Sequence, residues 1–448
     1  MTPVPRIGLF FNHDWDALGH ARQAGAWRFD EAGFDLFSFP ANARLAGFDL
    51  RRFAAAQARR GRQRGWVGVA SHNEQFGALA AALVAESLGL PGTRPEAVIA
   101  AQHKLHARRV LQQVAPEANL GFAELPAAYG EDIPGGLAYP AFVKPVKAAF
   151  SVLARRVRHR AELQAHTRFG WRELWVIRRL VEPFEQVRRE RLPGAGSAHR
   201  MLLEDPVPPG TPQYNLDGWV HQGRAQALGV VDAVMYPGTQ AFMRWELPSR
   251  LPAAVQARAL DVAQRFLAAI GFTHGLFNME FFHDPASGRL QVIEFNPRLA
   301  SQFSDLYLRV TGIDPHAVSL ALATGVDPAT LPRRPPVGGA AASFVYRTFP
   351  GEAAPCLPGA GTRARLRHDF PDALLFDYPR SASSLARDFK WLGSWRHGIV
   401  HLHGDDEHDL RERCIRASRV LGWRAPYADD WVAAPSAPGL ARPASASG

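Results

Sequence analysis

The sequence predicts a protein that combines α/β and α+β architecture in about three domains, and three observations lead to this prediction. A chain of 448 residues is too long for one core, because single domains usually hold ~150 residues. Residues 1–100 alternate strand-like apolar runs with helical spacing, which is typical of a doubly wound α/β domain. Residues 278–298 form two apolar-rich runs around a turn, which indicates a β-hairpin.

The composition is that of a soluble globular protein, with 47% hydrophobic and 21% charged residues. No run approaches the ~18 apolar residues that cross a bilayer, and the start lacks a basic leader before an apolar core. We therefore expect no membrane segment and no signal peptide. Cys356 and Cys414 are far apart and outside any metal spacing, which favours a cytoplasmic location.

The net charge of +10, from 52 basic and 42 acidic residues, raises the question of an anionic partner. Nucleic-acid binding would favour basic clusters with interleaved aromatic residues. The dense clusters at 51–52 and 59–64 lack those aromatics. We interpret the charge as arginine scattered over solvated surfaces and predict no nucleic-acid partner.

The predicted N-terminal domain has three strands, at residues 6–12, 34–39 and 66–70. Apolar residues then recur at helical spacing from Phe76 to Leu88, and Gly89 ends the helix.

Glu74 lies just past the third strand, where open α/β sheets place their ligands. This position makes Glu74 a substrate-site candidate. The alternative is an acid in the first turn of the helix that follows.

Two lysines stand out in the middle of the chain. Lys144 interrupts an apolar strand at 141–146, where an unpaired ammonium group would be costly, so an anion such as phosphate must accompany it. Lys104 lies near the start of a helix expected from residue 101 to about 114. Taken alone, Lys104 reads as an ordinary exposed helix lysine.

The hairpin carries the clearest chemistry. Glu294 and Asn296 are two residues apart on one strand, so they share a face, and the hairpin brings Glu280 beside them. Two carboxylates and an amide oxygen are ligands that suit Mg²⁺, and Arg298 follows as a cation for phosphate or carboxylate. The alternative is a surface hairpin with a wet polar face, but bulky apolar neighbours argue for a buried site.

These residues resemble the metal-binding signature of the ATP-grasp superfamily, in which a first glutamate is followed by an E-x-N-P-R string. The resemblance implies that ATP binds between two α+β subdomains with Mg²⁺ or Mn²⁺. It implies that Glu280, Glu294 and Asn296 hold the metal and that Arg298 faces the reacting phosphoryl group. It also places Lys104 and Lys144 as the two phosphate-binding lysines.

Two further segments take roles from this resemblance. The segment 199–207 resembles the linker between the subdomains, which implies adenine and ribose contacts for Glu204, Asp205 and Val207. The strand at 214–220 carries Asn215 where relatives often have an acid, so its nucleotide contact is an open expectation.

The loop at 147–151 departs from the family because it has no glycine. Alanine and phenylalanine restrict the backbone conformations that glycine would permit. We expect a stiffer loop, or side-chain contacts from Lys147 and Ser151, and the sequence leaves open whether this loop closes on the phosphates.

The resemblance extends to the domain order of biotin-carboxylase-like members. It predicts an N-terminal domain at 1–100 and an ATP-grasp domain at 101–330, with subdomains at 101–203 and 204–330. A helix is expected over 260–270, just before the hairpin. A small α+β domain at 331–432 should contain strands at 341–346 and 398–403 and a helix at 410–421. Residues 433–448 have the composition of a disordered tail.

The resemblance implies an ADP-forming ligase that activates a small-molecule carboxylate as an acyl phosphate and joins it to an amine. It leaves a homodimer open. One alternative is a biotin carboxylase, but Gln302 stands where those enzymes carry an acidic base. A second alternative is an ATP-binding module without catalysis, which loss of a metal ligand would favour.

Overall fold

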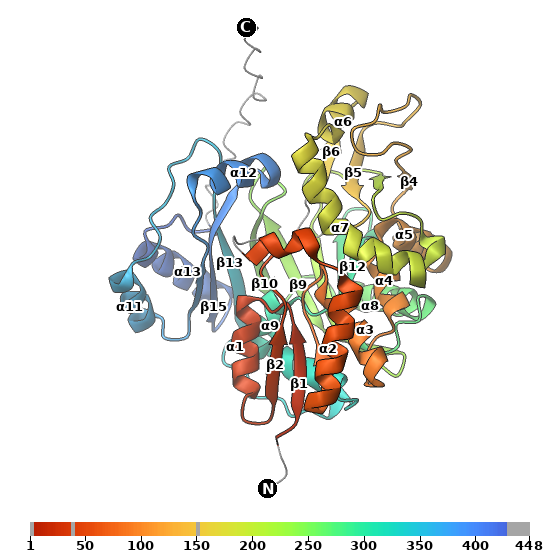
Figure 1. Cartoon of the computed structure of the whole chain (residues 1–448). Coiled ribbons are helices and arrows are strands. Elements are labelled where there is room, and N and C mark those ends of the chain that lie inside the picture. The colour runs from red at the N-terminus through yellow and green to blue at the C-terminus, as the bar shows by residue number, and fades with distance from the viewer. Residues whose placement is uncertain (1–3, 37–40, 149–152, 428–448) are drawn as a thin grey trace. The chain divides into compact units, whose positions relative to one another are not determined.

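The computed structural model describes residues 4–36, 41–148 and 153–427. They form two compact units. The larger unit lies within Met1–Asp232 and Leu247–Gly338, and the smaller unit lies within Ala233–Glu246 and Gly339–Gly448. Figure 1 labels their helices and strands.

The larger unit begins with three parallel strands in the order β2-β1-β3. On one face, Ile7 and Leu9 of β1 pack with residues of the later helix α10 (Pro315–Ala323), and on the other face Phe10 packs with α2 and α3. The sheet is therefore covered on both faces. The elements are β1 (Arg6–Phe10), α1 (Asp14–Gln23), β2 (Arg28–Ala32), α2 (Leu50–Arg64), β3 (Trp66–Ala70) and α3 (Gly77–Leu88). As predicted, α3 ends at a left-handed Gly89, with φ of 65°.

The second strand predicted at 34–39 is wrong. The strand is β2, Arg28–Ala32, while residues 34–36 form no strand and 37–39 lie outside the described residues. β2 is an edge strand, so it pairs on one side only and can carry charged residues. Its buried Asp30 accepts a hydrogen bond from Trp66 Nε1 at 2.7 Å, and Phe34 packs against Phe11 instead of joining the sheet.

The helix predicted from residue 101 to about 114 is confirmed from Lys104 to Val114, but its predicted start is wrong, because the backbone breaks at His103. Helix α4 spans Pro95–Gln102 and α5 spans Lys104–Val114. His103 is extended, with φ of −86° and ψ of 91°, and its Nδ1 accepts a hydrogen bond from the N–H of His106 at 3.1 Å. This side-chain cap starts α5 at Lys104.

A second sheet of four antiparallel strands follows, in the order β4-β7-β5-β6. Its core contains Val143, Leu163 and Met201. The elements are β4 (Phe122–Glu124), β5 (Ala141–Pro145), β6 (Arg155–Val157), α6 (Arg160–Thr167), α7 (Trp171–Arg191) and β7 (Met201–Glu204).

The third sheet of the larger unit has the order β12-β11-β8-β9, and the predicted hairpin is its β11–β12 edge. Phe266 of α8 stacks on Phe295 of β12, with ring centroids 3.9 Å apart. The expected helix 260–270 is the second half of α8. The elements are β8 (Gln213–His221), β9 (Arg224–Met235), α8 (Ala253–Ala269), β11 (Gly275–His283), β12 (Leu290–Asn296), α9 (Ser304–Thr311) and α10 (Pro315–Ala323).

The smaller unit contains strands in the order β10-β13-β15-β14. The strands and helix predicted for this region are found in β13, β15 and α13, and residues 433–448 lie outside the described residues. The elements are β10 (Phe242–Leu247), β13 (Ala340–Thr348), α11 (Ala360–Asp369), β14 (Leu374–Asp377), α12 (Ala382–Leu392), β15 (Trp395–Gly404) and α13 (Glu407–Leu421). In the described part of the chain, no helix is both long and apolar enough to span a bilayer.

Candidate active site

The β11–β12 hairpin brings the predicted acidic residues together. Glu280 pairs directly with Glu294, and Asn278 pairs with Asn296. The intervening Met279 and Phe295 point to the opposite face and are buried in the core beneath. Glu280, Glu294 and Asn296 therefore lie on one face, as strand alternation predicts.

The strand β8 adds two polar residues to this face. Asn215 pairs with Glu280 in the register of β8 and β11. Asn215 is buried, and its Oδ1 has no hydrogen-bond partner among the described residues. Gln213 donates to Glu280 Oε2 at 3.1 Å.

A β-bulge in the hairpin sets where its backbone carbonyls point. The register shifts between Glu280 and Phe281, whose partners are Glu294 and Val292, so Ile293 has no opposite residue. The carbonyl of Ile293 accepts hydrogen bonds from Lys144 Nζ at 3.1 Å and from Arg108 Nη2 at 3.0 Å. A bulge leaves one residue outside the ladder, and here the carbonyl of that residue binds two cations.

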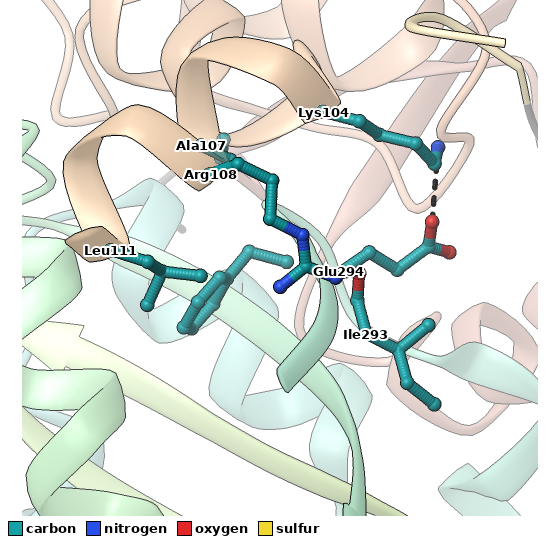
Figure 2. A pocket seen from close by; sticks show the side chains of 8 residues that line it. Lys104, Ala107, Arg108, Leu111, Ile293 and Glu294 are labelled. Atoms are coloured by element: carbon teal, nitrogen blue, oxygen red, sulfur yellow. Dashed lines mark hydrogen bonds and ion pairs between the residues drawn. The ribbon is translucent and has the colours of Figure 1, made fainter. Parts of the chain in front are cut away.

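The two glutamates have different electrostatic environments. Burial and, after it, the charge of the adjacent Glu294 raise the pKa of Glu280 to about 8. Burial also disfavours the charged form of Glu294, but Lys104, together with Lys144 and Arg298, outweighs this effect and lowers the pKa of Glu294 overall. Lys104 Nζ lies 3.0 Å from Glu294 Oε2, and Figure 2 shows this ion pair. Lys104 thus neutralises only one of the two carboxylates on the hairpin face.

Lys144 lies in β5 with its ammonium group buried between two partners. Its Nζ is 2.9 Å from Glu204 Oε2, in addition to its bond to Ile293. Arg108 Nε is 2.6 Å from the other oxygen of Glu204. Burial lowers the pKa of Lys144 to about 8, even though Glu204 opposes that change. Lys144 and Arg108 therefore share the carboxylate of Glu204 as their ion-pair partner.

Lys147 is the second buried lysine of this segment, only 1% exposed. Its Nζ donates to the backbone carbonyl of Glu74 at 3.2 Å and lies over the ring of Phe184. Burial lowers the pKa of Lys147 to about 8. Lys147 has no carboxylate within ion-pair distance among the described residues, so this region has a deficit of negative charge.

Arg298 forms an ion pair with Glu74, the substrate-site candidate that follows β3. Arg298 Nη2 lies 2.9 Å from Glu74 Oε2, and the same carboxylate is 2.9 Å from the amide of Asn296. Glu74 is not in the first turn of α3, which has no acidic residue, and it is Asn73 whose Oδ1 accepts from the N–H groups of Phe76 and Gly77 just before that helix. The side chain of Glu74 is thus directed at the hairpin and does not serve as a helix cap.

The remaining predicted residues lie at the edge of this group or outside it. Asp205 is exposed beyond the end of β7, and its N–H donates to the carbonyl of Gly121 at 2.9 Å. Val207 is half-buried in the same irregular stretch, whereas Glu204 contributes its side chain to the buried lysine and arginine. Ser151 lies outside the described residues.

Arg108 is the site residue that sequence reasoning missed. It is 2% exposed and holds Glu204, Asn119 and both bulge carbonyls, Val292 and Ile293. Figure 2 shows it reaching from α5 toward β12. Arg108 is four residues after Lys104, so the two share one face of α5. That spacing is the signal that could have identified it.

Two comparisons place the sequence beside curated proteins. A carnosine synthase from Gallus gallus is 32% identical over 267 residues, which are 57% of this chain and 27% of that protein. A D-alanine–D-alanine ligase from Synechococcus is 29% identical over 174 residues, or 38% of this chain and 45% of that protein. The chain thus spans less than half the length of these curated relatives. No protein-family model matches the sequence.

Solved structures are similar over nearly the whole chain. An L-amino acid ligase from Bacillus licheniformis aligns with a TM-score of 0.66 and 16% identity, covering 93% of this chain and 96% of that one. A carboxyaminoimidazole ribonucleotide synthase from Aspergillus clavatus, solved with ATP, gives 0.61 and 13%, with coverage of 93% and 98%. A biotin carboxylase from Campylobacter jejuni gives 0.57 and 14%, with coverage of 93% and 91%.

The similar structures show the fold of the chain. The chain has the ATP-grasp fold, as the motif from Glu294 to Arg298 indicates.

Proposed function

We propose that this chain is an ADP-forming ligase that uses Mg²⁺ and ATP to join a carboxylate to an amine. The observation that carries the proposal is that the larger unit contains two groups of incompletely neutralised charge. One group is negative and the other is positive. Glu280 and Glu294 pair directly on the hairpin, while Lys144 and Lys147 are buried with too little negative charge around them.

The hairpin residues fit a divalent metal ion. Three oxygen-bearing side chains, Glu280, Glu294 and Asn296, share one face. Burial and the adjacent charge of Glu294 raise the pKa of Glu280, and a bound cation would offset both effects. Hard oxygen donors of this kind suit Mg²⁺. When bound, Mg²⁺ would neutralise charge on the phosphates of ATP and polarise the transferred phosphoryl group.

The lysines fit the phosphates. Lys144 and Lys147 are cations whose lowered pKa values reflect burial without full compensation. A bound polyphosphate would supply the missing negative charge. Lys104, at the start of α5, would complete the set, with Ser151 as a further proposed contact.

The adenine and ribose would bind at the end of β7. We propose that the backbone of residues 204–207 contacts adenine and that Asp205, exposed beyond the strand, holds the ribose. This places the nucleotide between the β4–β7 sheet and the hairpin sheet, which we propose as the two halves of the ATP-grasp domain. Asn215 would face the phosphates from β8.

The reaction proposed here has two balanced steps. A substrate carboxylate oxygen attacks the γ-phosphorus of ATP, which forms an acyl phosphate and releases ADP. An amine nitrogen then attacks the acyl carbon, loses a proton and expels inorganic phosphate. Arg298, held in place by Glu74, would orient the carboxylate and stabilise charge on the reacting oxygens.

The substrate class is inferred from the similar proteins. The names of two of them specify amino acids, D-alanine in one and L-amino acids in the other. We propose that amino acids or closely related acids supply both the carboxylate and the amine. We include a cytoplasmic location in the same proposal.

The test is carboxylate-dependent ADP formation. Amino acids and small carboxylates would be screened in pairs for phosphate release, with mass spectrometry of the products and hydroxylamine to trap the acyl phosphate. Arg298→Ala should lower kcat on the order of 100-fold while ATP still binds, because its cation stabilises the transition state. Arg52→Ala, a change at a 91% exposed side chain, is the matched control. Wild-type turnover in Arg298→Ala would reject the proposal.

Biotin carboxylase activity is less well supported, although one similar structure is such an enzyme. Gln302 has no acidic group that could deprotonate bicarbonate. ADP formation that depends on bicarbonate and free biotin would favour this alternative. ATP binding without turnover on any substrate pair would favour a non-catalytic module.

A further inference from the structure

Three histidines from distant parts of the larger unit meet beneath the N-terminal sheet. His20 lies on α1, His72 follows β3 and His316 lies on α10. They are 4%, 4% and 1% exposed, and one ring nitrogen from each lies within 4.8 Å of the others. This is the one such group of potential metal ligands among the described residues.

A buried carboxylate fixes the orientation of two of these rings. Asp16 Oδ1 lies 2.8 Å from His72 Nδ1 and 3.2 Å from His316 Nε2. An ionised carboxylate only accepts hydrogen bonds, so these two nitrogens carry protons.

The opposite ring nitrogens are therefore available as lone-pair donors. Among the residues that the structure describes, His316 Nδ1 has no hydrogen-bond partner, and neither nitrogen of His20 has one. His72 Nε2 lies 2.8 Å from Ser319 Oγ, so this serine hydroxyl donates to it in the absence of another ligand.

The packing around the rings shows that the cluster is closely built. A β-carbon at Gly19 would lie 2.2 Å from His316 Nδ1, so only glycine lets this ring approach α1. His20 also packs against Phe29, with ring centroids 5.2 Å apart.

The simplest alternative is a packed aromatic core. Burying ring nitrogens without partners costs stability, however, and a phenylalanine would fill the same space without that cost. The orphaned nitrogens of His20 and His316 therefore indicate a missing ligand.

We propose that His20, His72 and His316 bind a divalent transition-metal ion of the Zn²⁺ class, with Asp16 as the carboxylate that orients two of the ligands. Neutral imidazole is a preferred ligand for Zn²⁺, and a ligating histidine usually donates its other N–H to a carboxylate or carbonyl. This site differs in chemistry from the hairpin, whose oxygen donors suit Mg²⁺.

Metal binding would draw the three rings together. Two ligands on a tetrahedral Zn²⁺ with Zn–N bonds of ~2.0–2.1 Å lie about 3.3 Å apart, whereas one ring nitrogen from each histidine lies within 4.8 Å of the others. Small side-chain rotations would close the gap, with Ser319 turning away from His72. The ion would then link α1, the segment after β3 and α10, and so stabilise the folded chain.

The experiment is a Zn²⁺ titration of the untagged full chain, without ATP and with excess Mg²⁺ to occupy oxygen sites. A competing chromophoric chelator reports affinity, and Co²⁺ reports tetrahedral nitrogen ligation by its visible absorption. We expect one Zn²⁺ per chain and a Tm that rises with Zn²⁺. His20→Phe keeps the ring packed on Phe29, and we expect it to lose affinity by at least about 100-fold; Asp16→Asn should lose on the order of 10- to 100-fold.

Two controls separate this site from others. His408→Gln changes an exposed histidine and should bind Zn²⁺ like wild type. Glu294→Gln alters the hairpin and should also retain Zn²⁺ binding, so the result does not depend on the proposed ligase function. If His20→Phe fails to fold, His316→Gln serves the same test. Equal Zn²⁺ affinity in wild type and the histidine variants, or no binding by wild type at micromolar Zn²⁺, would overturn the proposal.

Discussion

Lys147 lowers the stability of the folded chain, and we propose that the same residue binds the phosphates of ATP. Its pKa of about 8 lies below the ordinary lysine value of 10.5 because burial penalises the ammonium group. The unfolded chain therefore binds more protons than the folded chain between these two values. The destabilising effect is complete below pH 8 and disappears as the pH rises from about 8 to 10.5.

We predict that Lys147→Met stabilises the chain without ATP. The gain at pH 7 should be on the order of 1–3 kcal/mol, reduced by the lost contact with Phe184, and it should shrink toward pH 10. ATP affinity should fall in the same variant. Denaturant unfolding at several pH values measures the first effect, and calorimetry measures the second. A variant that is less stable than wild type at pH 7 would contradict this account.

Lys144 differs from Lys147 because it has a buried carboxylate partner. Lys144→Ala should lower ATP affinity sharply, and it should also destabilise the chain by about 1–3 kcal/mol, since Glu204 keeps only Arg108. Calorimetry on the folded variant separates the two effects. Arg52→Ala is again the control, and an unchanged ATP affinity in Lys144→Ala would remove this lysine from the phosphate site.

At the scale of the element, the bulge in the hairpin is the feature to test. Ile293 has no partner across the ladder, and its carbonyl binds Lys144 and Arg108. Deleting Ile293 should leave a regular hairpin in which Glu280 still faces Glu294. The two cations would lose an acceptor, so stability should fall by about 1–3 kcal/mol and ATP should bind more weakly.

Ile293→Val is the matched control for that deletion because it retains the backbone carbonyl. We expect this variant to bind ATP like wild type and to lose no more than ~1.5 kcal/mol of stability. Thermal unfolding and calorimetry of the two variants form the comparison. Equal behaviour of both would show that the bulge carbonyl is unimportant.

At the scale of the whole molecule, ligand binding should appear as a gain in stability. Mg²⁺ with ATP at 100 times Kd should stabilise the chain by about 2.7 kcal/mol, since only the folded state binds it. EDTA should abolish the gain. Glu294→Gln, which preserves shape but removes a ligand charge, should reduce it strongly. A full gain in Glu294→Gln, measured by thermal unfolding, would exclude Glu294 from the metal site.

Sequence alone predicted the parts of the molecule that depend on local pattern. The hairpin from Asn278 to Asn296 and the shared face of its polar residues follow from strand alternation over a few residues, and the structure confirms them. The helix at 77–88 and its end at Gly89 follow from spacing and from the left-handed backbone that glycine adopts. The errors at β2 and His103 arose where an edge strand tolerates charge and where a side-chain cap divides a helix.

Tertiary structure alone decided which residues meet. Glu74 and Arg298 are 224 residues apart, Glu204 binds Arg108 and Lys144 from two other elements, and the three histidines come from three distant segments. Local periodicity reports which face of an element is buried, but it holds no information about the partner across that face. Side-chain partners are chosen by packing, and packing exists only once the chain has folded.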